Sequence, residues 1–196
     1  MNIEKTRQLK ALAYFTIDDL VRILRIARAS VHVLCTRYVK NGTFVTLKNN
    51  FYVLDQNWGR LTSAELFKLA NHLQVPSYIS FMTAISHYEM TTQVQRDFFE
   101  SASLKRSVSM DTRGVVFKYC KLKKEYYSGF VKRHGFFIAT PEKAFVDALH
   151  LRSFGKYEFD MDSIDVRRFD RAKLKKIANV FPEKTRTAVE RLCRTW

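Results

Sequence analysis

The sequence is poor in cysteine, glycine and proline. Its three cysteines, Cys35, Cys120 and Cys193, are far apart and form no C-x-x-C pair, so neither a disulfide framework nor a zinc site is expected. The 6 glycines and 3 prolines among 196 residues exclude collagen-like and low-complexity sequences. This cysteine usage is typical of a reducing compartment, and we therefore predict a cytoplasmic location.

The sequence also lacks a segment suited to a membrane. The stretch Met1–Lys10 carries four charged side chains and no apolar core, so it does not have the pattern of a secretory signal. The longest nearly uncharged apolar stretch, Val75–Ile85, contains Pro76 and is shorter than the roughly 20 residues of a membrane span. We expect a soluble protein with no membrane partner.

Acidic residues are few compared with basic ones. The chain has 34 Lys and Arg against 19 Asp and Glu, which gives a formal net charge of +15. With 46% hydrophobic residues it has enough apolar side chains for a core, which excludes a disordered basic tail. The excess of basic residues is +6 in residues 1–60 (10 against 4), +1 in residues 61–120 (6 against 5) and +8 in residues 121–196 (18 against 10). This distribution predicts two separate positive surfaces.

The N-terminal part predicts three short helices followed by a β-hairpin. Thr16 and Asp19 form a capping box at the start of the second helix, and Ser30 is the expected N-cap of the third, which Gly42 ends. Two β-rich runs then follow, separated by residues 48–50, which suit a tight turn. This order is that of a winged helix-turn-helix, whose third helix enters the DNA major groove.

The third helix has an apolar face and a polar face. If the apolar residues at helical spacing from Val31 to Tyr38 face the core, the opposite face is available to a DNA groove. The predicted DNA-binding residues are Ser30, His32, Val33, Thr36, Arg37 and Lys40 on this face, with Lys48 and Asn49 at the hairpin turn.

The rest of the chain predicts a second domain of mixed composition. Asp55–Arg60 has the composition of a linker, which places the boundary between a DNA-binding domain of residues 1–57 and an α+β domain of residues 58–196. Thr62 with Glu65 predicts a capping box, and Ser77 a further N-cap. Short β-rich runs over residues 96–138 predict an antiparallel sheet, and helices are expected near residues 141–151, 170–178 and 182–192. The fold class is therefore α+β.

Three stretches carry a distinctive combination of motifs. They are Phe15–Leu54, with the helix and hairpin pattern above, Val75–Val94, which contains P-S-Y-I-S, and Phe137–Leu151, which contains A-T-P-E-K-A. Together they resemble the AbiEi-type antitoxins of type IV (abortive infection) toxin-antitoxin systems, which are also transcriptional regulators.

The resemblance implies two activities. One is binding of double-stranded DNA at the promoter of its own operon through the N-terminal winged helix, typical of a repressor. The other is neutralisation, through the C-terminal domain, of a nucleotidyltransferase-like toxin encoded beside it, with or without stable direct binding.

Two basic clusters lie in the C-terminal part. The denser one is the expected antitoxin surface, whose partner from the residues alone is either nucleic acid or an acidic protein. It comprises Arg167, Arg168, Arg171, Lys173, Lys175 and Lys176. The other has two interpretations, a phosphate-contacting face or a solvated edge strand protected by lysines. It comprises Lys118, Lys121, Lys123 and Lys124, with Lys132 and Arg133 on a following strand.

No catalytic or metal-binding pattern is complete, so we expect neither an enzyme nor a cofactor. The histidines form no H-E-x-x-H spacing. Asp160 and Asp162 resemble the paired carboxylates of nucleotidyltransferases, but the Gly-Ser dipeptide that accompanies them is absent. Two other functions stay open at this point: a nucleic-acid-processing enzyme targeted by the winged helix, and a basic RNA-binding protein.

Overall fold

The computed structural model describes residues 3–195 and shows an α+β chain made of two compact units. The N-terminal unit ends at Leu69 and the C-terminal unit begins at Ala70, so the division falls within helix α5 (Ser63–Leu73). This position is further along the chain than the boundary at 57/58 expected from the sequence.

The segment after the hairpin is a helix, where the sequence suggests a linker over Asp55–Arg60. Asp55–Trp58 forms helix α4, and the Asn57 side-chain amide donates to the backbone carbonyls of Lys10 and Leu12 at 3.0 and 3.2 Å. These bonds attach α4 to the end of the first helix. The expectation of a linker is therefore wrong.

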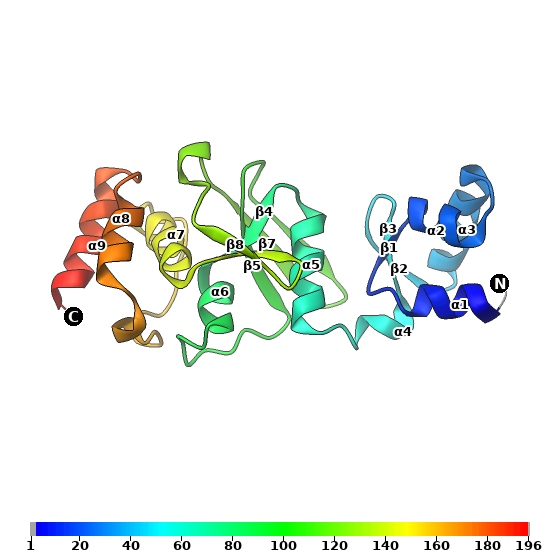
Figure 1. Cartoon of the computed structure of the whole chain (residues 1–196), viewed down its shortest axis with the longest axis horizontal. Coiled ribbons are helices and arrows are strands. Elements are labelled where there is room, and N and C mark those ends of the chain that lie inside the picture. The colour runs from blue at the N-terminus through cyan, green and yellow to red at the C-terminus, as the bar shows by residue number, and fades with distance from the viewer. Residues whose placement is uncertain (1–2, 196) are drawn as a thin grey trace. The chain divides into compact units, whose positions relative to one another are not determined.

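The N-terminal unit contains helices and one small antiparallel sheet with strand order β1-β3-β2 (Figure 1). Strand β1 directly precedes α2 and adds to the edge of the hairpin, which the sequence does not predict. The elements are α1 (Ile3–Lys10), β1 (Phe15–Thr16), α2 (Ile17–Leu24), α3 (Arg28–Lys40), β2 (Phe44–Lys48) and β3 (Phe51–Leu54).

Local capping decides where the helices of this unit begin and end. The capping box of Thr16 and Asp19 is confirmed, because the Thr16 hydroxyl accepts from the Asp19 amide and the Asp19 carboxylate accepts from the Thr16 amide. Gly42, at φ +78°, follows the end of α3 as expected. Ser30 is not the N-cap of α3: after the left-handed Arg25 ends α2, the chain re-enters helical geometry at Arg28.

The core of the N-terminal unit is formed by apolar side chains from both the helices and the strands. Phe15 and Phe44 meet edge to face with ring centroids 4.9 Å apart, and each fully buried side chain of this kind stabilises the fold by about 1.5–3 kcal/mol. The cluster comprises Leu9, Phe15, Ile17, Leu20, Leu24, Val31, Cys35, Phe44, Tyr52 and Leu54.

The C-terminal unit has a six-stranded sheet with helices packed beside it. Helices α6 and α7 pack against each other, and α8 and α9 pack on α7 (Figure 1). The expected helix starts at Thr140 and Asp170 are confirmed, as is the start at Thr62, which lies in the N-terminal unit. The elements are β4 (Ser77–Ile79), α6 (Phe81–His87), β5 (Phe98–Ser103), β6 (Val108–Thr112), β7 (Val115–Lys121), η1 (Lys124–Tyr126), β8 (Phe130–Arg133), β9 (Phe136–Ala139), α7 (Pro141–Ser153), η2 (Val166–Arg168), α8 (Arg171–Ala178) and α9 (Glu183–Thr195).

The sheet is mixed, with strand order β6-β7-β5-β4-β9-β8, and the expectation of an antiparallel sheet is wrong. The pairs β5–β7 and β4–β9 are parallel, because the chain returns to the sheet by connections that local sequence patterns do not encode. The expectation that Ser77 caps a helix is also wrong. It begins β4, which pairs with a strand on each side, and α6 starts after Ser80.

A fully buried ion pair lies at the centre of this unit. Lys143 and Asp147 are one helical turn apart on α7, both have no solvent exposure, and the ammonium donates to the carboxylate. The same carboxylate accepts from the Tyr78 hydroxyl at 2.9 Å and the Ser80 hydroxyl at 2.8 Å. The Lys143 ammonium also lies 5.1 Å from the centroid of the Phe181 ring. The pair therefore joins β4, α7 and the segment before α9.

Burial acts on both groups of the pair. It raises the pKa of Asp147, which the Lys143 charge and the two hydroxyl donors oppose, and it lowers the pKa of Lys143. Gly129, at φ +74°, passes so close that a Cβ there would lie 3.0 Å from the Lys143 side chain. The aliphatic part of the Lys143 side chain therefore leaves room only for a glycine at position 129 of the neighbouring loop.

We predict that Asp147→Ala lowers the free energy of unfolding by about 3–5 kcal/mol, because it leaves a buried ammonium without its partner. Urea unfolding followed by circular dichroism measures this loss. Lys173→Ala is the control, since it removes only a solvent-exposed ion pair, in which the Lys173 ammonium is 3.7 Å from the Asp170 carboxylate, and such pairs contribute little to stability. Equal, small losses for the two variants would contradict the structural role of the buried pair.

Candidate nucleic-acid interface

Helix α3 has one face in the core of the N-terminal unit and one face in solvent. Val31 and Cys35 are 0% and 1% exposed, and Leu34 and Tyr38 pack on the same core cluster. The sequence prediction of the buried face is confirmed.

The opposite face presents all six residues that the sequence places there. Val33 is 70% exposed and places an apolar group among the polar side chains of this face. The Thr36 hydroxyl donates to the His32 carbonyl at 3.0 Å, which leaves its oxygen able to accept a further hydrogen bond. The exposed set is Ser30, His32, Val33, Thr36, Arg37 and Lys40.

The β2–β3 hairpin carries the other two predicted residues. Asn49 is exposed in a two-residue turn that Asn50 completes at φ +60°, and a bulge between Thr46 and Lys48 adjusts the register before the turn. Lys48 is half-buried, with its ammonium 5.3 Å from the centroid of the Phe51 ring. The cation therefore lies along the hairpin, beside its own strand pair.

Two acids of α2 are paired with nearby cations. Asp18 accepts from Arg28, and Asp19 accepts from Arg22. Burial raises the pKa of the Asp19 carboxyl, but hydrogen bonds from Thr16 and Arg22 outweigh it and hold that pKa below its usual value. Arg37 and Lys40, by contrast, extend from the exposed face of α3 and add positive charge there.

The denser basic cluster, which the sequence suggests as the antitoxin surface, lies on η2 and α8 of the C-terminal unit. All six of its side chains are exposed: Arg167, Arg168, Arg171, Lys173, Lys175 and Lys176. Arg168 has a structural contact as well, because its guanidinium donates to the backbone carbonyls of Glu89 and Tyr88. The six residues therefore do not all serve one purpose.

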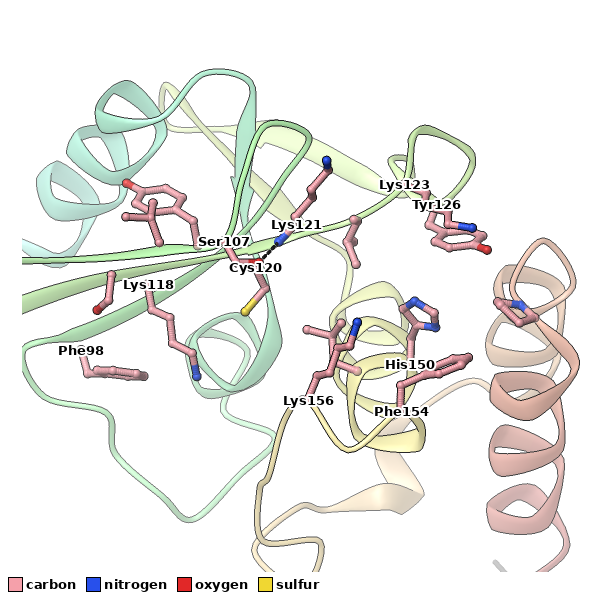
Figure 2. A pocket seen from close by; sticks show the side chains of 16 residues that line it. Phe98, Ser107, Lys118, Cys120, Lys121, Lys123, Tyr126, His150, Phe154 and Lys156 are labelled. Carbon is pink, nitrogen blue, oxygen red and sulfur yellow. Dashed lines mark hydrogen bonds between the residues drawn. The ribbon is translucent and has the colours of Figure 1, made fainter.

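A cleft of about 970 Å³ in the C-terminal unit brings together residues that the sequence does not link. Lys118 and Lys121 come from β7 and Lys123 from the segment after it, whereas His150 and Lys156 come from the end of α7 and the turn beyond it (Figure 2). Only the first three belong to a cluster visible in the sequence. Lys156 is brought to them by the packing of α7, a contact no local pattern signals.

The structure corrects the edge-strand interpretation for part of that sequence cluster. Strand β7 lies between β5 and β6 and ends at Lys121, so Lys118 and Lys121 are not on an edge strand, and Lys123 lies beyond the strand. Lys132 and Arg133 lie on β8, which is an edge strand. Cations on an edge strand discourage pairing with other chains.

Among residues 3–195 no group of three or more His, Cys, Asp or Glu is placed to hold a metal ion. Asp160 accepts from the backbone amide of Asp162 at 3.0 Å, which is a local turn contact. Cys35, Cys120 and Cys193 are buried as free thiols.

Within the described part of the chain, no helix has the length and apolar character needed to cross a membrane.

No protein-family model matches the chain, and no curated protein matches it.

Proposed function

We propose that this protein is a DNA-binding transcriptional regulator that also acts as the antitoxin of a type IV toxin-antitoxin system. In this proposal the N-terminal unit binds the promoter of its own operon as a winged helix-turn-helix. The C-terminal unit neutralises a nucleotidyltransferase-like toxin. The proposal assigns no reaction to the chain itself.

The observation that carries the DNA-binding part is the solvent face of α3. A helix whose exposed side combines Val33 with hydroxyl, imidazole and cationic groups has the chemistry that base edges require. The element order from α1 to β3, with three helices before a hairpin, also supports the proposal, because in a winged helix the helix before the hairpin enters the major groove.

Each residue type on α3 suggests a role. An arginine such as Arg37 can donate two hydrogen bonds to guanine, and an exposed aliphatic group such as Val33 can contact a thymine methyl group. Lys40 in the last turn of the helix, and Lys48 and Asn49 in the hairpin, are suited to phosphate oxygens, which position the protein without reading sequence.

We predict that Arg37→Ala and Lys40→Ala affect DNA binding differently. Loss of a base contact by Arg37→Ala reduces discrimination between promoter and random duplex by about 1–3 kcal/mol. Loss of a phosphate contact by Lys40→Ala weakens binding to both duplexes and lowers the slope of log affinity against log salt by about 0.9. Fluorescence anisotropy between 50 and 200 mM salt, roughly the range over which such slopes are resolved, measures both quantities.

Arg60→Ala is the matched control, because it removes an exposed cation outside α3 and the hairpin. It is expected to change neither the discrimination nor the slope. If Arg37→Ala weakened binding to promoter and random DNA equally, Arg37 would not read bases. If Lys40→Ala left the slope of log affinity against log salt unchanged, Lys40 would not contact a phosphate.

The antitoxin part rests on the resemblance and on the exposed cluster over η2 and α8. Because Arg168 also holds the backbone near Glu89, replacing it would mix a surface effect with a structural one. The cleaner test leaves Arg168 and Arg171 in place. It changes the four other exposed cations, Arg167, Lys173, Lys175 and Lys176, to Gln.

We predict that this fourfold Gln variant loses rescue of growth against the toxin, expected from the adjacent reading frame, but keeps promoter binding. The control changes four exposed cations elsewhere in the same unit to Gln and therefore removes equal charge; these are Lys105, Arg106, Lys124 and Lys132. Growth assays with induced toxin compare the two, with circular dichroism to verify folding. Full rescue by the first variant, or equal loss in both, would reject this surface.

A further inference from the structure

The 970 Å³ cleft of the C-terminal unit has no part in the function proposed above, yet its lining is unusual. Four lysines line it, and the described lining residues include no Asp or Glu. The cleft lies within one compact unit, between the β7 side and the end of α7 (Figure 2). Its volume is at the upper end of the roughly 300–1,000 Å³ of small-molecule sites.

The charge in the cleft is only partly compensated. The Lys118 ammonium is 3.4 Å from the buried Glu100 carboxylate, which also accepts from the Tyr157 hydroxyl at 2.6 Å. Lys121, Lys123 and Lys156 are exposed and have no such carboxylate among the described lining residues. The cleft therefore favours an anion.

His150, in the same lining, responds to this charge. Burial, followed by the charges of Lys143, Lys156 and Lys123, lowers its pKa to about 4, so the ring is neutral near pH 7. Its Nδ1 is 2.9 Å from the Thr185 hydroxyl, which fixes the ring. A neutral, fixed imidazole offers a flat surface and does not itself bind the anion by charge.

Aromatic rings continue that surface. Phe154 is 43% exposed, and its ring meets His150 edge to face with centroids 5.3 Å apart. His150 in turn meets Tyr126 at 5.1 Å, and Tyr126 stacks on Phe181 at 4.5 Å. Packed rings thus line the cleft at the end of α7, and the outermost, Phe154, is partly exposed, with the Lys184 ammonium 5.3 Å from its ring centroid.

We propose that the cleft is a nucleotide site, in which lysine ammonium groups bind the phosphates and the aromatic wall packs against the base. Lys123 and Lys156 are the phosphate-binding residues of this site, and Phe154 is its base-contacting residue. A simple anion would leave the rings in water, and an apolar ligand would desolvate ammonium groups without an anionic partner. A nucleotide satisfies both parts of the lining, since aromatic side chains stack on any base.

Isothermal titration calorimetry on the full chain tests this proposal with ATP, GTP, CTP and UTP. Adenosine and inorganic triphosphate are measured separately, as the nucleoside part and the phosphate part of such a ligand. At least one nucleoside triphosphate is expected to bind at least tenfold more tightly than adenosine or inorganic triphosphate alone. Lys156→Gln is expected to weaken nucleotide binding at least tenfold. Phe154→Leu is expected to weaken it at least fivefold and to leave inorganic triphosphate binding unchanged.

Lys124→Gln is the matched control, because this exposed lysine follows Lys123 in the sequence but does not line the cleft. It is expected to leave the affinity within twofold. Lys123→Gln replaces Lys156→Gln if circular dichroism shows that the latter is unfolded. No heat of binding for any nucleotide at millimolar concentration would overturn the proposal, as would equal losses for Lys124→Gln and the cleft variants.

The nucleotide can come from two sources, a free nucleoside triphosphate or the phosphorylated end of an RNA. Competition with a short 5′-phosphorylated RNA distinguishes them. Displacement of the bound nucleotide assigns the RNA end, and retention assigns the free nucleotide. The Lys40→Ala variant, which is altered in the N-terminal unit, is expected to bind the nucleotide as the unaltered chain does, so this result is independent of DNA binding.

Discussion

A lysine and an aspartate without solvent exposure hold the C-terminal unit together. The Lys143–Asp147 pair on α7 receives hydroxyl groups from β4 and from the residue before α6, and its ammonium lies against the ring of Phe181. Charges buried this deeply are tolerated only where every lone pair and proton has a partner, so the surrounding elements must take fixed positions. The position of α7 in turn places His150 and Phe154 opposite the end of β7. The cleft thus depends on a polar interaction that takes no part in ligand contact itself.

Basic side chains have different surroundings in the two units. In the N-terminal unit it lies on a helix face beside a hydroxyl-bearing and apolar surface, a combination suited to base edges and phosphates together. In the C-terminal unit it divides between an exposed helical cluster and a cleft lined with aromatic rings. An exposed helical cluster suits a macromolecular partner, whereas a concave site lined with packed rings suits a small one. The excess of basic residues behind the net charge of +15 is therefore best described as three local surfaces: the exposed face of α3, the cluster on η2 and α8, and the cleft. It does not amount to one general nucleic-acid-binding surface.

The sequence predicts the structure where a short-range interaction decides it. The Thr16 capping box, the left-handed Gly42 and the apolar face of α3 each involve residues within a few positions, and each is confirmed. Prediction fails where a distant segment decides. Ser77 joins a strand because β5 and β9 flank it, and Lys156 reaches the cleft because α7 is held by its buried pair. The exposed DNA-binding candidates are predictable from helical spacing, whereas a pocket assembled from segments far apart in the sequence is not.

The proposed regulatory function depends on the binding of promoter DNA by the exposed face of α3. Amide chemical shifts of the isotope-labelled full chain, recorded with and without a promoter duplex, test it most directly because they locate the contact without altering a residue. The largest changes are expected on α3 from Ser30 to Lys40 and on the hairpin at Lys48 and Asn49. Changes confined to the C-terminal unit, or no changes at all with promoter DNA in excess, would contradict it.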